Sequence, residues 1–273
     1  MRKSWLIIFQ TTTALFLTEL IVILGVLKMF RGASFFETQA AQPLSASQFL
    51  AVFLVSTFLL LFLLKVLRRK IVFEVIFGLS IFLGIWALFE LFFPEFALIA
   101  AAFSVALRYM FPFALLQNLV MIAGISGIAT ALGTAMPWSS MAVVLIALAV
   151  YDVIAVYGTR HMVTMFKGLL AQGVVFALII PDHPRLLLKR MTKVIPGEGF
   201  FFLGSGDLAL PALFVASATV HGLSYGLGAA VGATFGLLAT DFLFQWGGRR
   251  PMPALPPIAL GTLAGFFVVM LVK

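Results

Sequence analysis

The sequence predicts an all-α membrane protein with about nine bilayer-spanning helices. Of its 273 residues, 63% are hydrophobic and only 10% are charged, and the mean hydropathy is +1.16. A water-soluble core does not absorb so much apolar surface. Since one spanning helix needs roughly 20 mainly apolar residues, a chain of this length with short connections holds about nine. We therefore expect residues 1–273 to form a single polytopic membrane domain.

Charged residues and Pro/Gly punctuation divide the chain into the apolar segments that account for these helices. Residues 5–30 follow the basic start MRKSW, but the run is long and ends without a small-residue cleavage site, so we interpret it as a retained helix. The next five helices are expected at residues 49–67, 71–93, 95–109, 113–136 and 138–157. The last three are expected at residues 199–221, 223–246 and 253–272.

The connection between the sixth and seventh helices, residues 158–198, carries an amphipathic pattern. Within it, residues 161–180 place Lys167 among Phe166, Leu169 and Leu170, which favours a helix lying on the inner membrane surface. Such a helix either guards a lateral entrance for a substrate or only anchors the connection.

The positive charges predict the orientation of the helices. Alternate threading of nine helices puts 15 of the 18 lysines and arginines on the side of the N-terminus and leaves Lys28, Arg31 and Lys273 on the other. Because Lys and Arg accumulate in cytoplasmic loops, the N-terminus is expected in the cytoplasm and the C-terminus outside. Basic clusters beside the bilayer attract anionic lipid, which accounts for the net charge of +8 without a nucleic-acid partner.

The composition also excludes several kinds of site. The chain has no cysteine, so it has no disulfide, no thiol nucleophile and no Cys-based metal site. Its three histidines are scattered without ligand spacing. We expect neither a metal nor a cofactor.

Two aspartates stand in segments otherwise fit for lipid, Asp152 in AVYDVIAVYG and Asp207 in FFLGSGDLALPALF. A carboxyl group in a bilayer is costly and is normally kept for proton, ion or bond-breaking chemistry. Counted from Arg160 and Glu198 at ~1.5 Å per helical residue, the two lie ~12 Å and ~13 Å from the cytoplasmic face. Because sequential antiparallel helices usually pack together, the carboxyl groups are expected to face each other.

Such a pair suits hydrolysis, because two facing carboxyl groups in a low-dielectric site cannot both ionise and so share a proton. One group then activates a water while the other protonates the substrate carbonyl, as in aspartyl proteases. A proton-coupled transporter is the alternative, since carriers also build sites from paired carboxyl groups and broken helices. The residues favour the hydrolase, because no internal repeat relates the halves of the chain and both aspartates lie nearer one face.

Three motifs narrow the choice, since all occur in one family's order and on the sixth, seventh and ninth predicted helices. They are Tyr151-Asp152, Gly204-Ser205-Gly206-Asp207 and Pro253-Ala254-Leu255. In this set, and over most of its length, the chain resembles the presenilin and signal peptide peptidase family of nine-helix intramembrane aspartyl proteases. A type IV prepilin peptidase would share the GxGD pattern but not the proline-alanine-leucine segment.

The resemblance implies that Asp152 and Asp207 are the catalytic pair, that the other motif residues shape the site, and that the substrates are transmembrane helices of other proteins. The predicted orientation and the YDVIAV and PALP segments are closer to presenilin, which favours substrates whose N-terminus lies outside. The compact chain suggests a microbial, archaeal-type member in the cell membrane that needs no accessory subunit. Ser205 stands where presenilins usually carry leucine, which bears on cleavage-site preference.

The start of the last helix is expected to be irregular, because its prolines lack the N–H that a helix needs. These prolines are Pro251, Pro253, Pro256 and Pro257. A helical substrate must unwind before cleavage, and backbone exposed at residues 253–255 is predicted to receive it as an added strand.

Two further carboxyl groups, those of Glu19 and Asp241, are expected within the first and eighth helices. For each, an interhelical hydrogen bond is favoured over a role in substrate gating.

Overall fold

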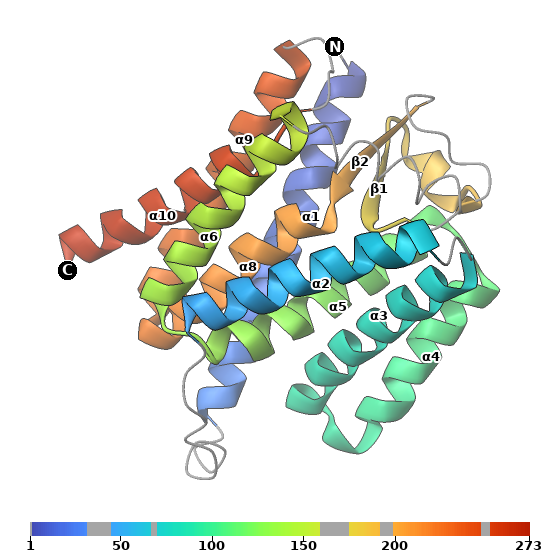
Figure 1. Cartoon of the computed structure of the whole chain (residues 1–273), viewed down its shortest axis with the longest axis horizontal. Coiled ribbons are helices and arrows are strands. Elements are labelled where there is room, and N and C mark those ends of the chain that lie inside the picture. Colours follow the sequence, from blue (N-terminus) through green and yellow to red (C-terminus); the bar gives the residue numbers. More distant parts are fainter. Residues whose placement is uncertain (1, 32–44, 67–69, 159–174, 192–198, 247–251) are drawn as a thin grey trace.

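The computed structural model describes residues 2–31, 45–66, 70–158, 175–191, 199–246 and 252–273. Within these residues the chain forms nine α-helices and one two-stranded sheet (Figure 1). The helices are α1 (Arg2–Arg31), α2 (Ala46–Val66), α3 (Lys70–Phe92), α4 (Ala97–Met110), α5 (Ala114–Thr134), α6 (Trp138–Val153), α8 (Ser205–His221), α9 (Leu223–Trp246) and α10 (Leu255–Val272). Six of the described segments, those of α1, α3, α5, α6, α9 and α10, are long and apolar enough to cross a membrane. The predicted helical membrane architecture and number of helices are thus confirmed for the part of the chain that the structure describes.

The seventh predicted helix starts later than the sequence suggested. A helix was expected from residue 199, but Phe200–Gly204 form strand β2, which pairs antiparallel with strand β1 (Ala177–Pro181). Strand β1 also replaces the end of the amphipathic helix predicted over residues 161–180, most of which lies outside the described residues. Both strands are short apolar runs, and periodicity alone does not distinguish a buried strand from a buried helical segment.

Three helix ends also differ from regular α-helix. Pro94–Phe96 form a 3-10 turn before α4, and Ile154–Gly158 form a π-helical turn after α6. The last helix begins at Leu255 after non-helical residues, so the predicted irregular start is confirmed.

Two amide side chains hold the hairpin of β1 and β2 against the helices. Asn118 of α5 brackets Ile179 of β1, because its Oδ1 accepts from the Ile179 N–H at 2.8 Å and its Nδ2 donates to the Ile179 carbonyl at 2.7 Å. Gln10 of α1 donates to the carbonyl of Pro181 at 2.9 Å. Since a buried backbone group without a partner is costly, these amides stabilise β1 by bonding to backbone groups of Ile179 and Pro181. The hairpin is therefore fixed beside the start of α8.

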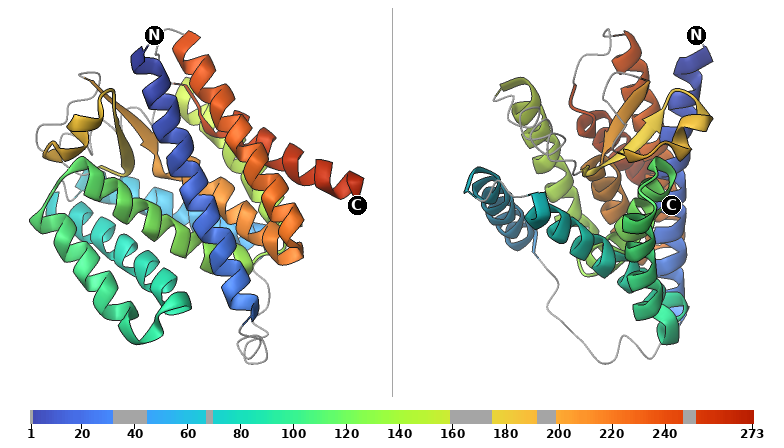
Figure 2. Two further views of the ribbon diagram at one scale, coloured as in Figure 1. Left: turned by 180° about the vertical axis from the view of Figure 1, so that it is seen from behind. Right: turned by 90° about the vertical axis from the view of Figure 1, so that its right-hand side faces the viewer.

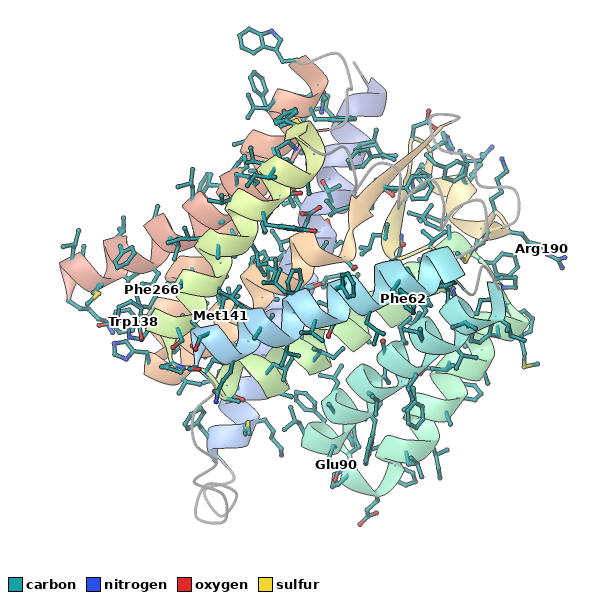
Figure 3. All side chains as sticks on the ribbon, viewed as in Figure 1. Phe62, Glu90, Trp138, Met141, Arg190 and Phe266 are labelled. Atoms are coloured by element: carbon teal, nitrogen blue, oxygen red, sulfur yellow. The ribbon has the colours of Figure 1, made fainter. Side chains whose placement is uncertain are left out.

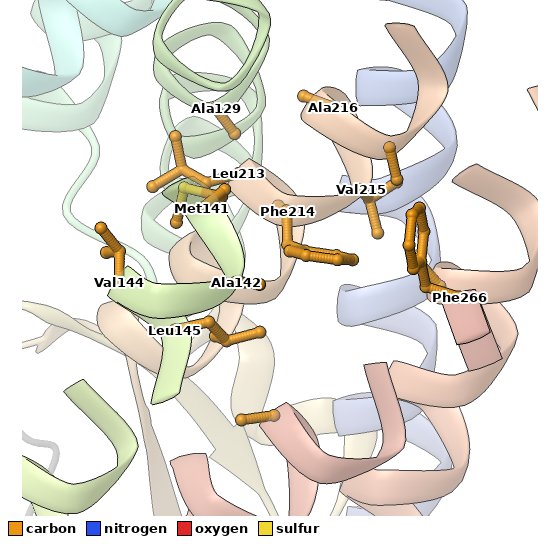
Figure 4. Packing of buried hydrophobic residues seen from close by; sticks show 14 of the residues in the cluster. Ala129, Met141, Ala142, Val144, Leu145, Leu213, Phe214, Val215, Ala216 and Phe266 are labelled. Atoms are coloured by element: carbon orange, nitrogen blue, oxygen red, sulfur yellow. The ribbon is translucent and has the colours of Figure 1, made fainter. Parts of the chain in front are cut away.

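Helix α8 lies at the centre of the bundle and contacts α1, α5, α6, α9 and α10. Figure 2 shows α1 lying along α9 and crossing α5. In the core, Phe214 of α8 meets Phe266 of α10 edge-on, with ring centroids 5.4 Å apart, and Met141 and Leu145 of α6 complete the cluster (Figure 4). Many side chains project from the outer faces of the helices (Figure 3). Large apolar residues are among the exposed ones, for example Phe103 and Phe235 at 64% and 67% exposure, as expected of surfaces that face lipid.

The two further carboxyl groups differ in their hydrogen bonding. Thr11 Oγ1 of α1 donates to Asp241 Oδ2 of α9 at 2.7 Å, so the predicted interhelical hydrogen bond is confirmed for Asp241. Glu19 is only 1% exposed, and neither of its carboxyl oxygens has a hydrogen-bond partner among the described residues. For Glu19 the predicted hydrogen bond is therefore absent from the described part of the chain.

Replacement of Glu19 by leucine is expected to stabilise the fold. A buried polar group without a partner costs about 1–3 kcal/mol, and leucine removes that group at similar volume. Asp241→Leu is expected to have the opposite effect, because it removes the hydrogen bond from Thr11. Thermal unfolding of the two purified variants in one detergent compares them. A Glu19→Leu variant that melts below the parent protein would show that the carboxyl group is satisfied after all.

Candidate active site

Asp152 lies in the last turn of α6, is only 7% exposed, and is bound by the start of α10. The N–H of Leu255 donates to Asp152 Oδ2 at 3.2 Å, and the backbone of Ala254 also hydrogen-bonds to this carboxyl group. Leu255 is the first residue of α10, so its N–H has no carbonyl partner within the helix. The carboxyl group also lies at the positive end of the α10 dipole, which favours a negative charge there. The proline-alanine-leucine segment thus contacts the first aspartate directly.

Asp207 lies in the first turn of α8, whereas counting from Glu198 predicted a place well inside a helix. Gly204 ends β2 and caps α8, and its backbone hydrogen-bonds to the Asp207 carboxyl group. A side chain that reaches back over three residues to the cap is the arrangement of a capping box. The extended residues of β2 therefore take the place of the expected helical turns, and the hairpin sets the position of Asp207.

Both aspartates line one pocket of about 380 Å³, and their carboxyl groups interact electrostatically. Around them the walls are mainly apolar. The lining residues are Phe53, Phe77, Ser80, Ile81, Met121, Gly124, Ile125, Ile128, Leu148, Tyr151, Phe176, Ser205, Gly206, Ala209, Leu210 and Leu255. An apolar pocket with a few convergent polar groups is the usual form of a catalytic or binding site. No group of three or more potential metal ligands occurs among the described residues.

Most of the residues nominated by the three motifs meet at this pocket. Tyr151, Ser205, Gly206 and Leu255 line it together with the two aspartates. Gly204 and Ala254 stand behind the wall, where their backbones contact Asp207 and Asp152 respectively. Pro253 is buried but does not line the pocket.

The two glycines of the second motif have different surroundings. A Cβ atom added at Gly204 would lie 2.9 Å from Oδ2 of Asp207, whereas one added at Gly206 would have no heavy atom within 4 Å. Gly204 therefore leaves room for the carboxyl group. Gly206 leaves open the space of the pocket that it lines.

Apart from Ser80, no feature of the sequence indicates the opposite wall of the pocket. Phe53 of α2 meets Tyr151 edge-on, with ring centroids 6.2 Å apart. Phe77 of α3 packs in the same manner on Phe176, which immediately precedes β1, at 4.8 Å. Phenylalanines are so frequent in this chain, at 30 residues, that single ones carry no signal. Ser80 was the only hint, as a hydroxyl group in an otherwise apolar stretch of α3.

The chain is similar to a known protein family and to solved structures. The family model described as signal-peptide peptidase, presenilin aspartyl protease matches residues 11–273. A solved structure of a presenilin family intramembrane aspartate protease, in space group C222, is 25% identical, with a TM-score of 0.65 over 97% of each chain. A second, in space group P2, is also 25% identical, with a TM-score of 0.67 over 96% of each chain. No match was found among curated proteins.

Proposed function

Because the chain belongs to the signal-peptide peptidase and presenilin aspartyl protease family and is an intramembrane aspartyl protease, we propose that Asp152 and Asp207 are its catalytic pair. The observation that carries this assignment is that both carboxyl groups line one pocket, each held by backbone hydrogen bonds from a different motif. The comparisons give no support to a proton-coupled transporter.

In this proposal the two carboxyl groups share one proton and hold a water between them. The ionised group takes a proton from the water, whose oxygen attacks the carbonyl carbon of the scissile peptide bond, while the protonated group gives its proton to the carbonyl oxygen. The tetrahedral intermediate collapses when the amide nitrogen receives a proton and leaves as an amine. The hydrogen bonds from the start of α10 and from Gly204 keep the carboxyl groups in place, so that little reorganisation is needed.

We assign the binding of a transmembrane substrate segment to the apolar walls of the pocket. The other motif residues at or behind these walls, Tyr151, Gly204, Ser205, Gly206, Pro253, Ala254 and Leu255, shape the site. The notion that residues 253–255 receive the substrate as a strand needs revision, because the N–H of Leu255 donates to Asp152 and the carbonyl of Ala254 accepts from Thr240 at 3.3 Å. Strand β2 is the better candidate, since only one of its edges is paired within the described residues and it leads to Asp207.

We place the N-terminus in the cytoplasm and the C-terminus outside, in the cell membrane of a microbial, archaeal-type organism. The asymmetry of the lysines and arginines supports this orientation. It favours substrates whose N-terminus lies outside. The protein then acts on them in the lipid bilayer as a single chain, without an obligate accessory subunit.

Cleavage of a model single-span peptide by the purified chain in lipid vesicles tests the proposal. The peptide is presented in both orientations, and mass spectrometry of the products locates the cut. Cleavage within the apolar span of the N-terminus-outside form supports the activity, the orientation and the independence from other subunits. Preferential cleavage of the reversed form would refute the orientation alone, and intact peptides in both forms would count against the single-chain enzyme.

The two glycines give a sharper test of the site. Gly204→Ala is expected to lower kcat about tenfold or more, because the Asp207 carboxyl group must shift and small misplacements are costly in catalysis. Gly206→Ala narrows the pocket without touching the carboxyl group, so it is expected to raise KM and to leave kcat within about threefold of the parent value. Steady-state kinetics with the same peptide separates the two effects. Equal losses of kcat would contradict the distinction.

Leu255 is expected to tolerate little change of polarity. It is 3% exposed, lines the pocket, and carries the N–H that bonds to Asp152. Leu255→Glu places a third carboxyl group beside the pair and is expected to reduce kcat/KM at least about 100-fold, while Leu255→Met, of similar volume, loses less than about tenfold. Undiminished cleavage by the Leu255→Glu variant would remove this residue from the site.

A further inference from the structure

We propose that the chain has a binding site for one anionic glycerophospholipid at the α4–α5 junction, away from the pocket of the two aspartates. One acyl chain lies in an apolar groove, called here the junction groove, and the phosphate group lies against Arg185 and Arg190. The groove is lined by Leu107, Phe111, Phe113, Leu115, Leu116, Leu119 and Leu188.

The junction groove has an apolar lining that suits hydrocarbon, and its volume suits part of an acyl chain. Its volume is about 280 Å³, and every lining residue is apolar. Leu119 is 52% exposed and Leu188 is 65% exposed, so the groove opens outward at the surface of the bundle. One wall of the groove comes from a 3-10 helix, Pro184–Leu188, whose last residue, Leu188, lines the groove. This wall leaves a depression beside α4 and α5 that no described side chain fills.

Backbone pairing places Arg190 at the groove. Residues 189–191 run antiparallel to residues 112–114. The N–H of Met191 donates to the carbonyl of Pro112 at 2.8 Å, and the N–H of Ala114 donates to the carbonyl of Lys189 at 3.3 Å. Phe113 and Arg190 are directly opposite in this bridge. Since opposite residues of an antiparallel pair project to the same side, Arg190 stands next to a residue that lines the groove. Its side chain is exposed and extends outward from the bundle (Figure 3).

The 3-10 helix brings a second cation to the same place. Side chains three residues apart eclipse each other in a 3-10 helix, so Arg185 lies over Leu188 at the rim of the groove. Lys189 is directed elsewhere, with its Nζ 5.2 Å from the centre of the Phe200 ring. Asp182, the acidic residue of this segment, precedes the 3-10 helix, and its N–H donates to Gly199 at 2.9 Å. Residues 182–191 carry one acidic and three basic side chains, so the groove has a positive rim.

An apolar groove with a positive rim at the end of a membrane helix fits a phospholipid better than a soluble anion or a peptide. The arginines suit a phosphate group and the groove suits hydrocarbon. Of the three kinds of ligand, only a phospholipid carries both groups in one molecule. Basic residues near a membrane surface also favour lipids of net negative charge over zwitterionic ones. The positive rim and the apolar groove therefore match the head group and the acyl chain of an anionic glycerophospholipid.

Native mass spectrometry of the purified full chain tests this site, with phosphatidylglycerol and phosphatidylcholine of identical acyl chains as probes. The Arg185→Gln/Arg190→Gln double variant is expected to bind the first phosphatidylglycerol roughly 25-fold more weakly than the parent, about fivefold for each arginine. Phosphatidylcholine binding should weaken less, because its choline group offsets the charge of its phosphate. The matched control is Lys28→Gln/Lys273→Gln, which removes the same charge at residues far from the groove and is expected to bind like the parent.

A third variant tests the hydrocarbon part of the site. Leu119→Trp fills the groove from an exposed position while keeping all charges, and it is expected to weaken binding of both lipids. Melting temperatures without lipid check that each variant folds, and phosphatidylglycerol should raise that of the parent more than that of the double variant. Equal loss of phosphatidylglycerol in the control, or no loss in the double variant, would overturn the proposal. A lipid-free dimer that Leu119→Trp abolishes would assign the groove to a second copy of the chain instead.

Discussion

Replacement of either Asp152 or Asp207 by asparagine is expected to reduce peptide cleavage by at least about 10³-fold. Asparagine has the same shape and still accepts hydrogen bonds, so the bonds from Leu255 to residue 152 and from Gly204 to residue 207 are retained. It cannot exchange a proton with water or a substrate carbonyl. The loss is therefore chemical and not structural, and the two single variants should be as inactive as the double variant because the pair acts as a unit.

The matched control for this experiment is Asp241→Asn. Asp241 is also a buried aspartate in a helix, 4% exposed, but it accepts a hydrogen bond from Thr11 and does not line the pocket. This variant is expected to cleave within about threefold of the parent rate. All variants should bind a substrate peptide and melt near the parent temperature. Residual turnover well above background in Asp152→Asn or Asp207→Asn would refute the catalytic pair, and a comparable loss in Asp241→Asn would show that the assay reports stability.

The helices and the nominated aspartates could be predicted from the sequence because both depend on local signals. A lipid-facing helix needs a long apolar run, and a carboxyl group in such a run is conspicuous at once. The order of the motifs on the sixth, seventh and ninth helices placed Asp152, Asp207 and Leu255 on three elements, and the structure brings these three to one pocket.

The hairpin could not be predicted because its pairing is non-local. Strand β1 and strand β2 are separated by residues 182–199, which include the 3-10 helix Pro184–Leu188, and each strand is an apolar run that suits a helix equally well. The residue that identifies β1 is Asn118, whose amide bonds to Ile179 from a distance of 61 positions along the chain. From the sequence alone, the amide of Asn118 indicates neither that its partner is Ile179 nor that Ile179 lies in a strand. Because the sequence did not predict β2, Asp207 was expected well inside a helix. The structure places it in the first turn of α8, directly after the end of β2.

A single methyl group between α9 and α10 is expected to damage both stability and catalysis. Gly228, Gly232 and Gly236 on α9 lie at intervals of one helical turn, and they face Gly261 and Gly265 on α10. A Cβ atom at Gly232 would collide with the carbonyl oxygen of Gly261, and one at Gly261 would collide with that of Gly232. The obstacle in both cases is backbone, which cannot rotate away as a side chain can. Small residues at such a contact allow two membrane helices to approach closely.

Two effects of Gly232→Ala oppose each other, and their magnitudes decide the sign. Alanine favours a helix over glycine by about 1 kcal/mol. Forcing extra volume into a tight contact costs typically about 1–3 kcal/mol, and the backbone clash places this site at the upper end. Net destabilisation is therefore expected. Because α10 begins at Leu255, which bonds to Asp152, a shift of α10 is also expected to lower kcat about tenfold or more.

The control for this prediction is a glycine without a close backbone neighbour. A Cβ atom at Gly158, in the π-helical turn after α6, would meet only the Cγ2 of Ile154, at an ordinary 3.6 Å. Gly158→Ala is expected to melt at or above the parent temperature and to retain activity, whereas Gly232→Ala and Gly261→Ala should melt lower and cleave more slowly. If Gly232→Ala instead melted above the parent, helix propensity would outweigh the clash. The close contact of α9 and α10 would then not be what holds the start of α10 against Asp152.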